Sequence, residues 1–218
     1  MLYPPDYPKK AIMEYLKNKK RPENDFWVLY GRHTKPTLVE CDEKNNQSKQ
    51  RNMALRYIKR WRNCIDIGSN VGIWTRELAS KFKKVYCFEP NPNFNECFRK
   101  NITENNIELF EFGLSNKEHT ASQEFNSTQM TNTPGNVQCR TLDSFNLNNI
   151  DFIKIDVDGF EVEVLEGAVE TITRNNPVIN IEVKRLKRPE ICKKIKRILY
   201  GLNYHPRMRV RSDEIWTK

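Results

Sequence analysis

The stretch CIDIGSNVGIWTRELA, residues 64–79, constrains the fold of this chain most, because it joins a buried strand to a helix through a glycine turn. The apolar residues of its first half are typical of a strand, and the spacing after Gly72 is typical of a helix. Between them lie Gly68, Ser69 and Asn70. Glycine and asparagine adopt positive φ most readily, and glycine has no Cβ to obstruct a neighbour. The turn is therefore suited to close contact with a bound molecule.

The chain beyond this turn alternates between strand and helix patterns. Strands are predicted over 85–89, 107–113, 150–157 and 177–183, helices over 93–104, 161–174 and from Pro189 onward, and two further strands close the chain. A short antiparallel excursion through VQCRTL is compatible with the polar stretch before the strand at 150–157. This βαβαβ order is typical of a mostly parallel sheet with helices on both faces, and it ends in an antiparallel C-terminal strand. The predicted fold class is α/β.

The residues before the glycine turn divide into two parts. A helix is predicted over 8–20, followed by an irregular arm with one short strand over FWVLY (26–30). A second helix over 48–61 leads into the first strand of the sheet. At 218 residues the chain has room for one core with a small extension. We expect an N-terminal helix and irregular arm over residues 1–45 and a single α/β domain over residues 46–218.

Composition and the start of the chain bear on the compartment. No apolar run approaches the length of a membrane span, and MLYPPDYPKK has the features of neither a secretory signal nor an Arg/Ser-rich transit peptide. The six cysteines include no C-x-x-C pair, which is typical of a reduced chain. We therefore expect a cytoplasmic protein that does not associate with a membrane.

The positive charge of the chain indicates a possible class of binding partner. The 37 Lys and Arg residues outnumber the 28 Asp and Glu residues and give a net charge of +9. Basic residues cluster in four segments, 17–21, 184–188, 193–197 and 207–211. A single cluster is usually the solvated face of a helix or strand, but three of the four lie close together near the C-terminus. A polyanionic partner such as a nucleic acid would fit such a basic surface.

Two acids lie on either side of the glycine turn. Asp66 comes shortly before Gly68, where a carboxylate would repel a phosphate but attract an ammonium group directly or through water. Glu89 ends the next strand about twenty residues later, where an acid commonly binds the two hydroxyls of a ribose. The spacing G-x-x-x-G matches neither a dinucleotide motif nor a P-loop. An amino acid attached to a ribose fits both acids, and S-adenosylmethionine (SAM) has that structure.

A series of motifs resembles one known family. The segments DIGSNVGIWT, VYCFEPNPNFNECFRKNI, FGLSN, TLDSF, IDFIKIDVDGFEVEVLEGA and INIEV occur in this order. Together they resemble the FkbM family of SAM-dependent methyltransferases over about residues 60–217. The resemblance implies a class I Rossmann-like methyltransferase fold, in which the ribose binds Glu89 and the adenine lies near Leu114 and Ser115. The residues that it implies for the other SAM contacts are Asp66, Gly68, Ser69, Asn70 and Gly72. Acceptors vary within the family, so the resemblance does not define the substrate.

The end of the apolar run 150–157 is the predicted centre of the chemistry. Because the methyl group of a sulfonium is already electrophilic, the protein mainly has to align the acceptor and remove one proton. Asp156 lies at the end of this strand beside the cofactor cleft, so we expect it to border the cofactor and to act as the general base. Asp158 and Glu161 follow in DVDGFE, where neighbouring carboxylates can raise one pKa. Asp158, where the family more usually has a glutamate, could instead be the N-cap of the next helix, with Glu161 at N3.

Two further catalytic candidates are Glu182, at the end of the strand 177–183, and His33, in the N-terminal arm. A lone histidine is more often structural, which weakens the case for His33. Asp156, Asp158 and Glu182 could together hold a divalent cation. Their spacing does not match an EF-hand and includes no histidine, so no metal site is predicted and a role for a metal is left open.

Three functions are compatible with these features. The leading interpretation is an O-methyltransferase acting on a hydroxyl of a sugar-like small molecule or glycan, an acceptor that could be anionic. The alternative is an RNA ribose 2′-O-methyltransferase, favoured by the basic C-terminal region and by an incomplete similarity to a Lys-Asp-Lys-Glu arrangement through a lysine near residue 49, Asp156 and Lys184. The third is a SAM-binding module without turnover, and the presence of Asp156 beside an intact glycine turn argues against it.

Overall fold

The structure is a computed structural model. It describes residues 25–29, 36–40, 47–123, 127–183 and 189–218. The helix expected over residues 8–20, the candidate His33 and the basic segment that contains Lys184 lie outside the described residues. The division of the chain at residue 45 therefore stays a prediction.

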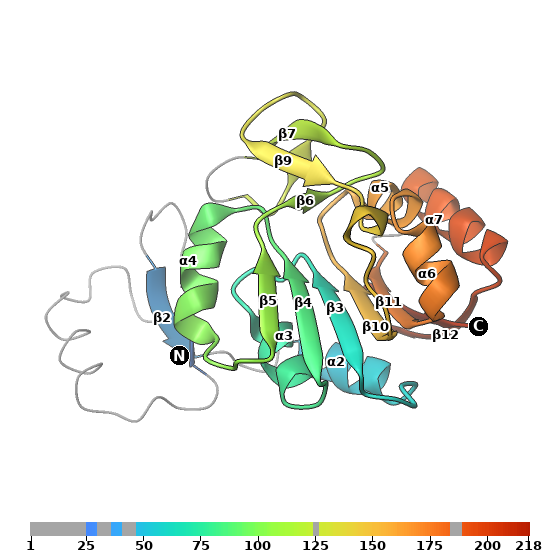
Figure 1. Ribbon diagram of the computed structural model, residues 1–218, viewed down its shortest axis with the longest axis horizontal. Coiled ribbons are helices and arrows are strands. Elements are labelled where there is room, and N and C mark those ends of the chain that lie inside the picture. Colours follow the sequence, from blue (N-terminus) through green and yellow to red (C-terminus); the bar gives the residue numbers. More distant parts are fainter. Residues whose placement is uncertain (1–24, 30–35, 41–46, 124–126, 184–188) are drawn as a thin grey trace, which may run out of the picture.

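A seven-stranded sheet forms the centre of the molecule (Figure 1). Its strands are β3 (Asn63–Ile67), β4 (Lys84–Phe88), β5 (Ile107–Phe110), β10 (Ile150–Ile155), β11 (Val178–Glu182), β12 (His205–Val210) and β13 (Asp213–Thr217). The order across the sheet is β12-β13-β11-β10-β3-β4-β5. The five strands from β11 to β5 are parallel, whereas β13 and β12 run antiparallel to their neighbours. The predicted mostly parallel sheet with an antiparallel C-terminal addition is confirmed.

Helices cover both faces of this sheet, as predicted (Figure 1). The helices are α2 (Ser48–Leu55), α3 (Ile73–Ala79) and α4 (Pro92–Asn101) on one face, and α5 (Glu161–Glu166), α6 (Val169–Asn175) and α7 (Pro189–Gly201) on the other. Each face has its own apolar core, because alternate residues of a strand point to opposite sides. On β10, for example, Phe152 packs toward α3, while Ile153 and Ile155 pack toward α5 and α7.

Two smaller sheets flank the central one. Four short strands lie over one end of the central sheet, namely β6 (Gly113–Leu114), β7 (His119–Gln123), β8 (Met130–Thr131) and β9 (Val137–Arg140). Figure 1 shows β6, β7 and β9 beyond the ends of β5 and β4. An antiparallel hairpin, β1 (Asp25–Leu29) and β2 (Pro36–Glu40), lies beside α4. Only the first strand of this hairpin was predicted from the sequence.

Three predicted elements end or divide differently in the structure. The helix expected over 48–61 ends at Leu55, and the strand expected over 107–113 divides into β5 and β6. The helix expected over 161–174 divides into α5 and α6 at Gly167. The Gly167 carbonyl oxygen accepts a hydrogen bond from the backbone of Asp143, in the short 3-10 helix Asp143–Phe145, instead of continuing the helix. The Asp143 carboxylate then accepts the first free amides of α6, so the new helix start is capped from outside the helix.

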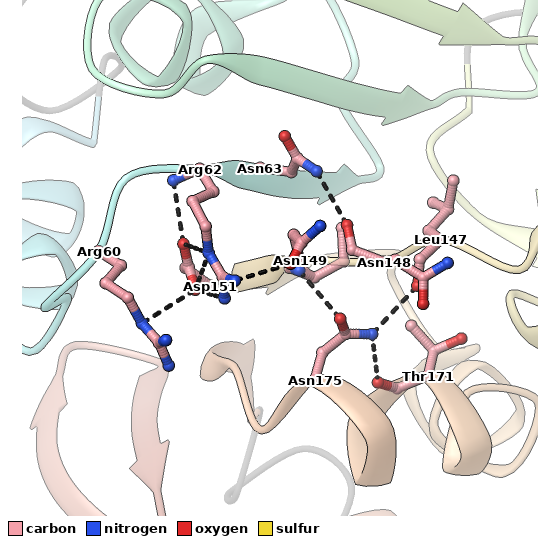
Figure 2. A network of polar contacts seen from close by, with 10 residues as sticks. Arg60, Arg62, Asn63, Leu147, Asn148, Asn149, Asp151, Thr171 and Asn175 are labelled. Atoms are coloured by element: carbon pink, nitrogen blue, oxygen red, sulfur yellow. Dashed lines mark hydrogen bonds and ion pairs between the residues drawn. The ribbon is translucent and has the colours of Figure 1, made fainter.

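A polar network ties the amino ends of β3 and β10 together (Figure 2). The guanidinium of Arg62, just before β3, donates to the Asp151 carboxylate of β10 at 2.6 Å and to the Asn149 side chain at 2.7 Å. Burial raises the pKa of Asp151, but the hydrogen bonds from Arg62 outweigh it and hold that pKa below its usual value. Asn175 of α6 extends the network by accepting a hydrogen bond from the backbone of Ile150. The network lies at the end of the strands opposite to the end where the glycine turn follows β3.

Replacing Asp151 by alanine is expected to lower the thermal midpoint at pH 7 by about 4–8 °C, because Arg62 loses a charged hydrogen-bond partner. Since the pKa of Asp151 is depressed in the folded chain, its contribution is present above the ordinary carboxyl pKa and is lost as the pH falls through the lower, folded value. Thermal unfolding followed by circular dichroism between pH 7 and pH 2 measures both effects.

Arg60→Ala is the matched control, because Arg60 is 70% exposed and lies 3.9 Å from Asp151. Exposed ion pairs contribute little, so a shift of under about 2 °C is expected. Equal shifts for Arg60→Ala and Asp151→Ala would contradict the assigned role of the network.

Across the described ranges, every helix is too short or too polar to cross a bilayer.

Candidate active site

A cavity of about 340 Å³ opens at the carboxyl ends of the parallel strands. It lies where the strand order reverses between β3 and β10, which is the usual ligand position in an open parallel sheet. Its volume falls within the range of small-molecule sites. The cavity is lined by Gln47, Ile67, Gly68, Ser69, Asn70, Ile73, Trp74, Phe88, Glu89, Pro90, Phe112, Gly113, Leu114, Gln123, Thr128, Met130, Lys154, Asp156, Val157, Asp158 and Glu182.

The glycine turn forms one wall of the cavity. Gly68 has φ +72°, and a Cβ at this position would lie 1.9 Å from the backbone oxygen of Asp156. Only glycine therefore lets the turn after β3 approach the end of β10 so closely. Asn70 also has positive φ, +50°. Gly72, with φ +91°, is the N-cap of α3 and packs against Ile102 without lining the cavity.

Glu89 faces the cavity from the end of β4 and is 4% exposed. Its Oε2 accepts the backbone N–H of Asn70 at 3.0 Å, and its Oε1 accepts that of Asn91 at 2.9 Å. These bonds fix the carboxylate between the glycine turn and the loop after β4. Burial raises the pKa of Glu89 to about 7, although both amides act in the opposite direction.

Asp66 lies beneath the cavity instead of lining it. Its carboxylate accepts a hydrogen bond from Thr75 Oγ1 at 2.7 Å and lies 3.1 Å from Lys154 Nζ. The side chain is fully buried. From the sequence, Asp66 is expected to attract an ammonium group directly or through water. Because Thr75 and Lys154 hold this carboxylate and the cavity lining does not include Asp66, the structure offers no direct contact, and a contact through water stays a prediction.

Lys154 is a member of the site that the sequence analysis missed. Its Nζ donates to the Gly68 carbonyl oxygen at 2.7 Å and reaches the cavity from within β10. Burial lowers the pKa of Lys154, but Asp66 and Asp156 outweigh it, so the pKa lies above its usual value. One signal was present in the sequence, since Lys154 is the only cation within the apolar run IDFIKIDV.

Three carboxylates stand on the side of the cavity formed by β10 and β11. Asp156 follows β10 and donates its backbone N–H to the Ile67 carbonyl oxygen at 3.2 Å. Asp158, with φ +51°, accepts a hydrogen bond from the hydroxyl of Thr128, which lies just before β8 of the small sheet. Glu182 ends β11 and accepts a hydrogen bond from Ser212 Oγ at 3.1 Å. The carboxyl ends of the two strands therefore bring acidic groups to one rim.

The expected helix-capping role of Asp158 is wrong. The N-cap of α5 is Phe160, and no side chain caps it. Instead, Glu161 Oε1 accepts the backbone N–H of Gly159 at 3.0 Å. The left-handed conformation of Asp158 turns its side chain to Thr128, so Asp158 belongs to the cavity rim and not to the helix.

Two buried oxygen atoms of the lining lack a partner among the described residues. They are Ser69 Oγ, in the glycine turn, and Gln123 Oε1, at the end of β7. Buried polar atoms are normally hydrogen-bonded, so these two atoms are suited to a polar ligand. Leu114 lines the same part of the cavity, whereas Ser115 is buried behind it. Gln123 could not be found from sequence, because the small sheet that positions it has no distinctive pattern.

The structure brings most of the predicted site residues together. Those that line the cavity are Gly68, Ser69, Asn70, Glu89, Leu114, Asp156, Asp158 and Glu182. Asp66, Gly72 and Ser115 lie outside its lining, and His33 is outside the described residues. Among the described residues, no group of three or more His, Cys, Asp and Glu side chains is arranged to hold a metal ion.

The sheet order and the position of the cavity define the class I methyltransferase fold, and comparison with solved structures agrees. A methyltransferase FkbM from Methylobacillus flagellatus has a TM-score of 0.54 at 17% identity, covering 73% of this chain and 45% of that one. A precorrin-6y C5,15-methyltransferase from Geobacter metallireducens has a TM-score of 0.52 at 14% identity, covering 88% and 93%. At these identities the likeness concerns the fold alone.

A match over most of the chain identifies the family. The model of the methyltransferase FkbM domain matches residues 66–211. The chain belongs to this family of SAM-dependent methyltransferases. A similar curated protein is the hexuronic acid methyltransferase AglP of Haloferax volcanii, 29% identical, with 52% of this chain and 53% of that protein covered. The chain thus spans about half the length of that relative.

Proposed function

We propose that this chain binds SAM in the described cavity and transfers its methyl group to a hydroxyl of a sugar-like small molecule or glycan. The observation that carries the proposal is the convergence of Glu89, Asp156, Asp158 and Glu182 on one cavity behind a glycine turn. An acidic lining is suited to a ligand with a sulfonium and an ammonium group. We assign both hydroxyls of the ribose to Glu89, and the Ser69 and Gln123 oxygens, which have no partner among the described residues, can accept further hydrogen bonds.

The acceptor chemistry is assigned to Asp156. Bound SAM supplies an electrophilic methyl group on a positively charged sulfur. Asp156 would accept the proton of the acceptor hydroxyl as its oxygen takes the methyl group. The sulfur–methyl bond would break in the same step, which would convert SAM into the neutral thioether S-adenosylhomocysteine (SAH). A hydroxyl needs such a base because it is a weak nucleophile while protonated. Asp158 and Glu182, on the same rim, are the groups that can orient further hydroxyls of a sugar.

The sugar class is supported by the relative from Haloferax volcanii, whose name describes a methyltransferase of a hexuronic acid. Carboxylates are common partners for sugar hydroxyls because they accept two hydrogen bonds each. The rim residues Asp158 and Glu182 therefore fit a polyhydroxyl acceptor better than an apolar one.

A second candidate, an RNA ribose 2′-O-methyltransferase, is favoured by the basic surface near the C-terminus. Arg207, Arg209 and Arg211 are exposed on and after the edge strand β12, and Lys193 and Lys194 are exposed on α7. Such residues attract phosphates, but no base-stacking pattern of aromatic and basic residues accompanies them in the sequence. Sugar methylation is therefore the first choice.

The proposal predicts binding of SAH to the purified chain and transfer of tritium from methyl-tritiated SAM to a sugar acceptor. Isothermal calorimetry with SAH measures the first. A panel of neutral sugars, uronic acids and oligosaccharides, set beside capped and uncapped RNA oligonucleotides, measures the second. Ribose-specific labelling of RNA whose binding weakens steeply with salt would replace the first candidate by the second. Absence of SAH binding would contradict the cofactor assignment itself.

A further inference from the structure

A buried lysine lies in the middle of the central sheet. Lys154 is aligned with Asp66 of β3 on one side and with Asn180 of β11 on the other. Its side chain is only 4% exposed. The chain neighbours Ile153 and Ile155 point to the opposite face, into the core beneath α5 and α7. The sheet therefore encloses a charged group at the point where its strand order reverses.

The ammonium of Lys154 is bonded to the glycine turn. Nζ donates to the Gly68 carbonyl oxygen at 2.7 Å and lies 3.4 Å from that of Ile67. It also lies 3.1 Å from Asp66 Oδ1, and the other oxygen of that carboxylate accepts the Thr75 hydroxyl of α3. One side chain of β10 thus connects the end of β3, the turn and the helix that follows it.

The same ammonium stands among carboxylates from three strands. Asp66 lies on β3, Asp156 comes directly after β10 and two residues after Lys154, and Asp213 begins β13. All three favour the charged form of the lysine. Burial raises the pKa of Asp213 to about 6, against a hydrogen bond from Asn180. The other charged groups that share the cavity with Asp156, among the residues described, are Glu89, Asp158 and Glu182.

Stability alone is a weak reason for a buried ion pair. The loss of water around two charges offsets most of their attraction, and a well-packed apolar pair of similar size is often as stable. An apolar residue in place of Lys154 would lack two things. It would leave the Gly68 carbonyl oxygen without the Lys154 donor, and it would remove one positive charge that acts on Asp156.

We propose that Lys154 is a positioning residue, whose ammonium fixes the glycine turn through the Gly68 carbonyl oxygen and supplies a positive charge that favours the ionised form of Asp156. The inference rests on the proposed function, because it acts through Asp156 as proton acceptor. It also gives Asp66 a definite place, since this carboxylate holds the ammonium from the side away from the cavity.

The test uses two single variants with opposite expected effects on one carboxyl group. In protein labelled with ¹³C-aspartate, the Asp156 carboxyl resonance is assigned by its loss in Asp156→Asn and is titrated with pH. Lys154→Met is expected to raise the pKa of Asp156 by about one to three units, because a nearby positive charge is lost. Asp66→Asn removes a negative charge and leaves the lysine in place, so the pKa of Asp156 is expected to stay at or below its original value. A general loss of packing would not separate the two variants in this way.

Calorimetry with SAH provides the second readout. Lys154→Met is expected to weaken SAH binding by about tenfold or more, because the turn loses the donor that holds its first carbonyl. Asp66→Asn retains that donor and is expected to weaken binding less. If Lys154→Met does not fold, the charge-balanced Asp66→Asn/Lys154→Met chain replaces it and is compared with Asp66→Asn. A higher pKa of Asp156 and weaker SAH binding are again expected.

The inference is overturned if the pKa of Asp156 is the same in the Lys154→Met and original chains, or if it rises equally in Lys154→Met and Asp66→Asn. Neither titration requires SAH or an acceptor. Failure of the original chain to bind SAH would therefore contradict the proposed function, while the titration would still decide whether Lys154 controls the charge of Asp156.

Discussion

Asp156→Asn is expected to lower the rate constant of methyl transfer by about 10²–10⁴-fold, because asparagine keeps the shape of the side chain but cannot accept the acceptor's proton. The Kd for SAH is expected to change by less than about threefold, since Asp156 acts on the acceptor more than on the cofactor. Transfer of tritium from methyl-tritiated SAM to the acceptor found in the panel measures the first quantity, and calorimetry measures the second.

Glu163→Gln is the matched control for this change. Glu163 lies on α5, outside the lining of the cavity, so the same loss of one carboxylate charge is expected to leave transfer within about twofold of the original rate. A fully active Asp156→Asn chain would show that the proton leaves by another route. Glu182→Gln and Asp158→Asn would then be the next variants to measure, because both residues line the same cavity.

The parallel sheet could be predicted because each of its strands is an apolar run that can be recognised from neighbouring residues in the sequence. The run IDFIKIDV is buried along most of its length, as its apolar character predicts, and the glycines of the first turn mark where β3 ends. The carboxyl ends of parallel strands meet at one edge, so the sequence alone is enough to place Glu89, Asp156 and Glu182 on a common rim. These inferences need only the order of elements along the chain.

The positions of the buried residues beneath the cavity depend on how neighbouring strands align, and this register cannot be read from the sequence. Asp66 has the position of a strand-end acid, but it pairs with Lys154 across β3 and β10 and does not line the cavity. The Asp158 carboxylate is hydrogen-bonded to Thr128, which is 30 residues away, just before β8. Contacts of this kind are set when strands align, so periodicity along one strand cannot reveal them.

The protonation state of Glu89 makes ligand binding in the cavity dependent on pH. With a pKa of about 7, Glu89 holds a proton in much of the ligand-free protein at neutral pH. The folded chain then binds more protons than the unfolded one between the ordinary carboxyl pKa and about 7. Glu89 therefore lowers the free energy of unfolding as the pH rises through this window. Two ribose hydroxyls that donate to Glu89 would favour the charged carboxylate, so the ligand-bound protein would prefer the deprotonated form of Glu89.

Binding of SAH is therefore expected to strengthen as the pH rises from 5 to 8, with Kd falling about tenfold per unit below the pKa of Glu89 and levelling off above it. The sign follows from the raised pKa, because at low pH the ligand hydroxyls must displace a proton from the carboxyl group that they bind. Calorimetry at several pH values, in buffers of different ionisation enthalpy, would also detect the release of up to one proton per SAH bound. Glu89→Gln keeps the shape of the side chain but does not titrate, so this variant is expected to bind SAH more weakly and with almost no dependence on pH. Any pH dependence that remains in this variant measures the titration of SAH itself. An unchanged pH dependence in Glu89→Gln would remove Glu89 from the ribose site and assign the titration to another group of the cavity.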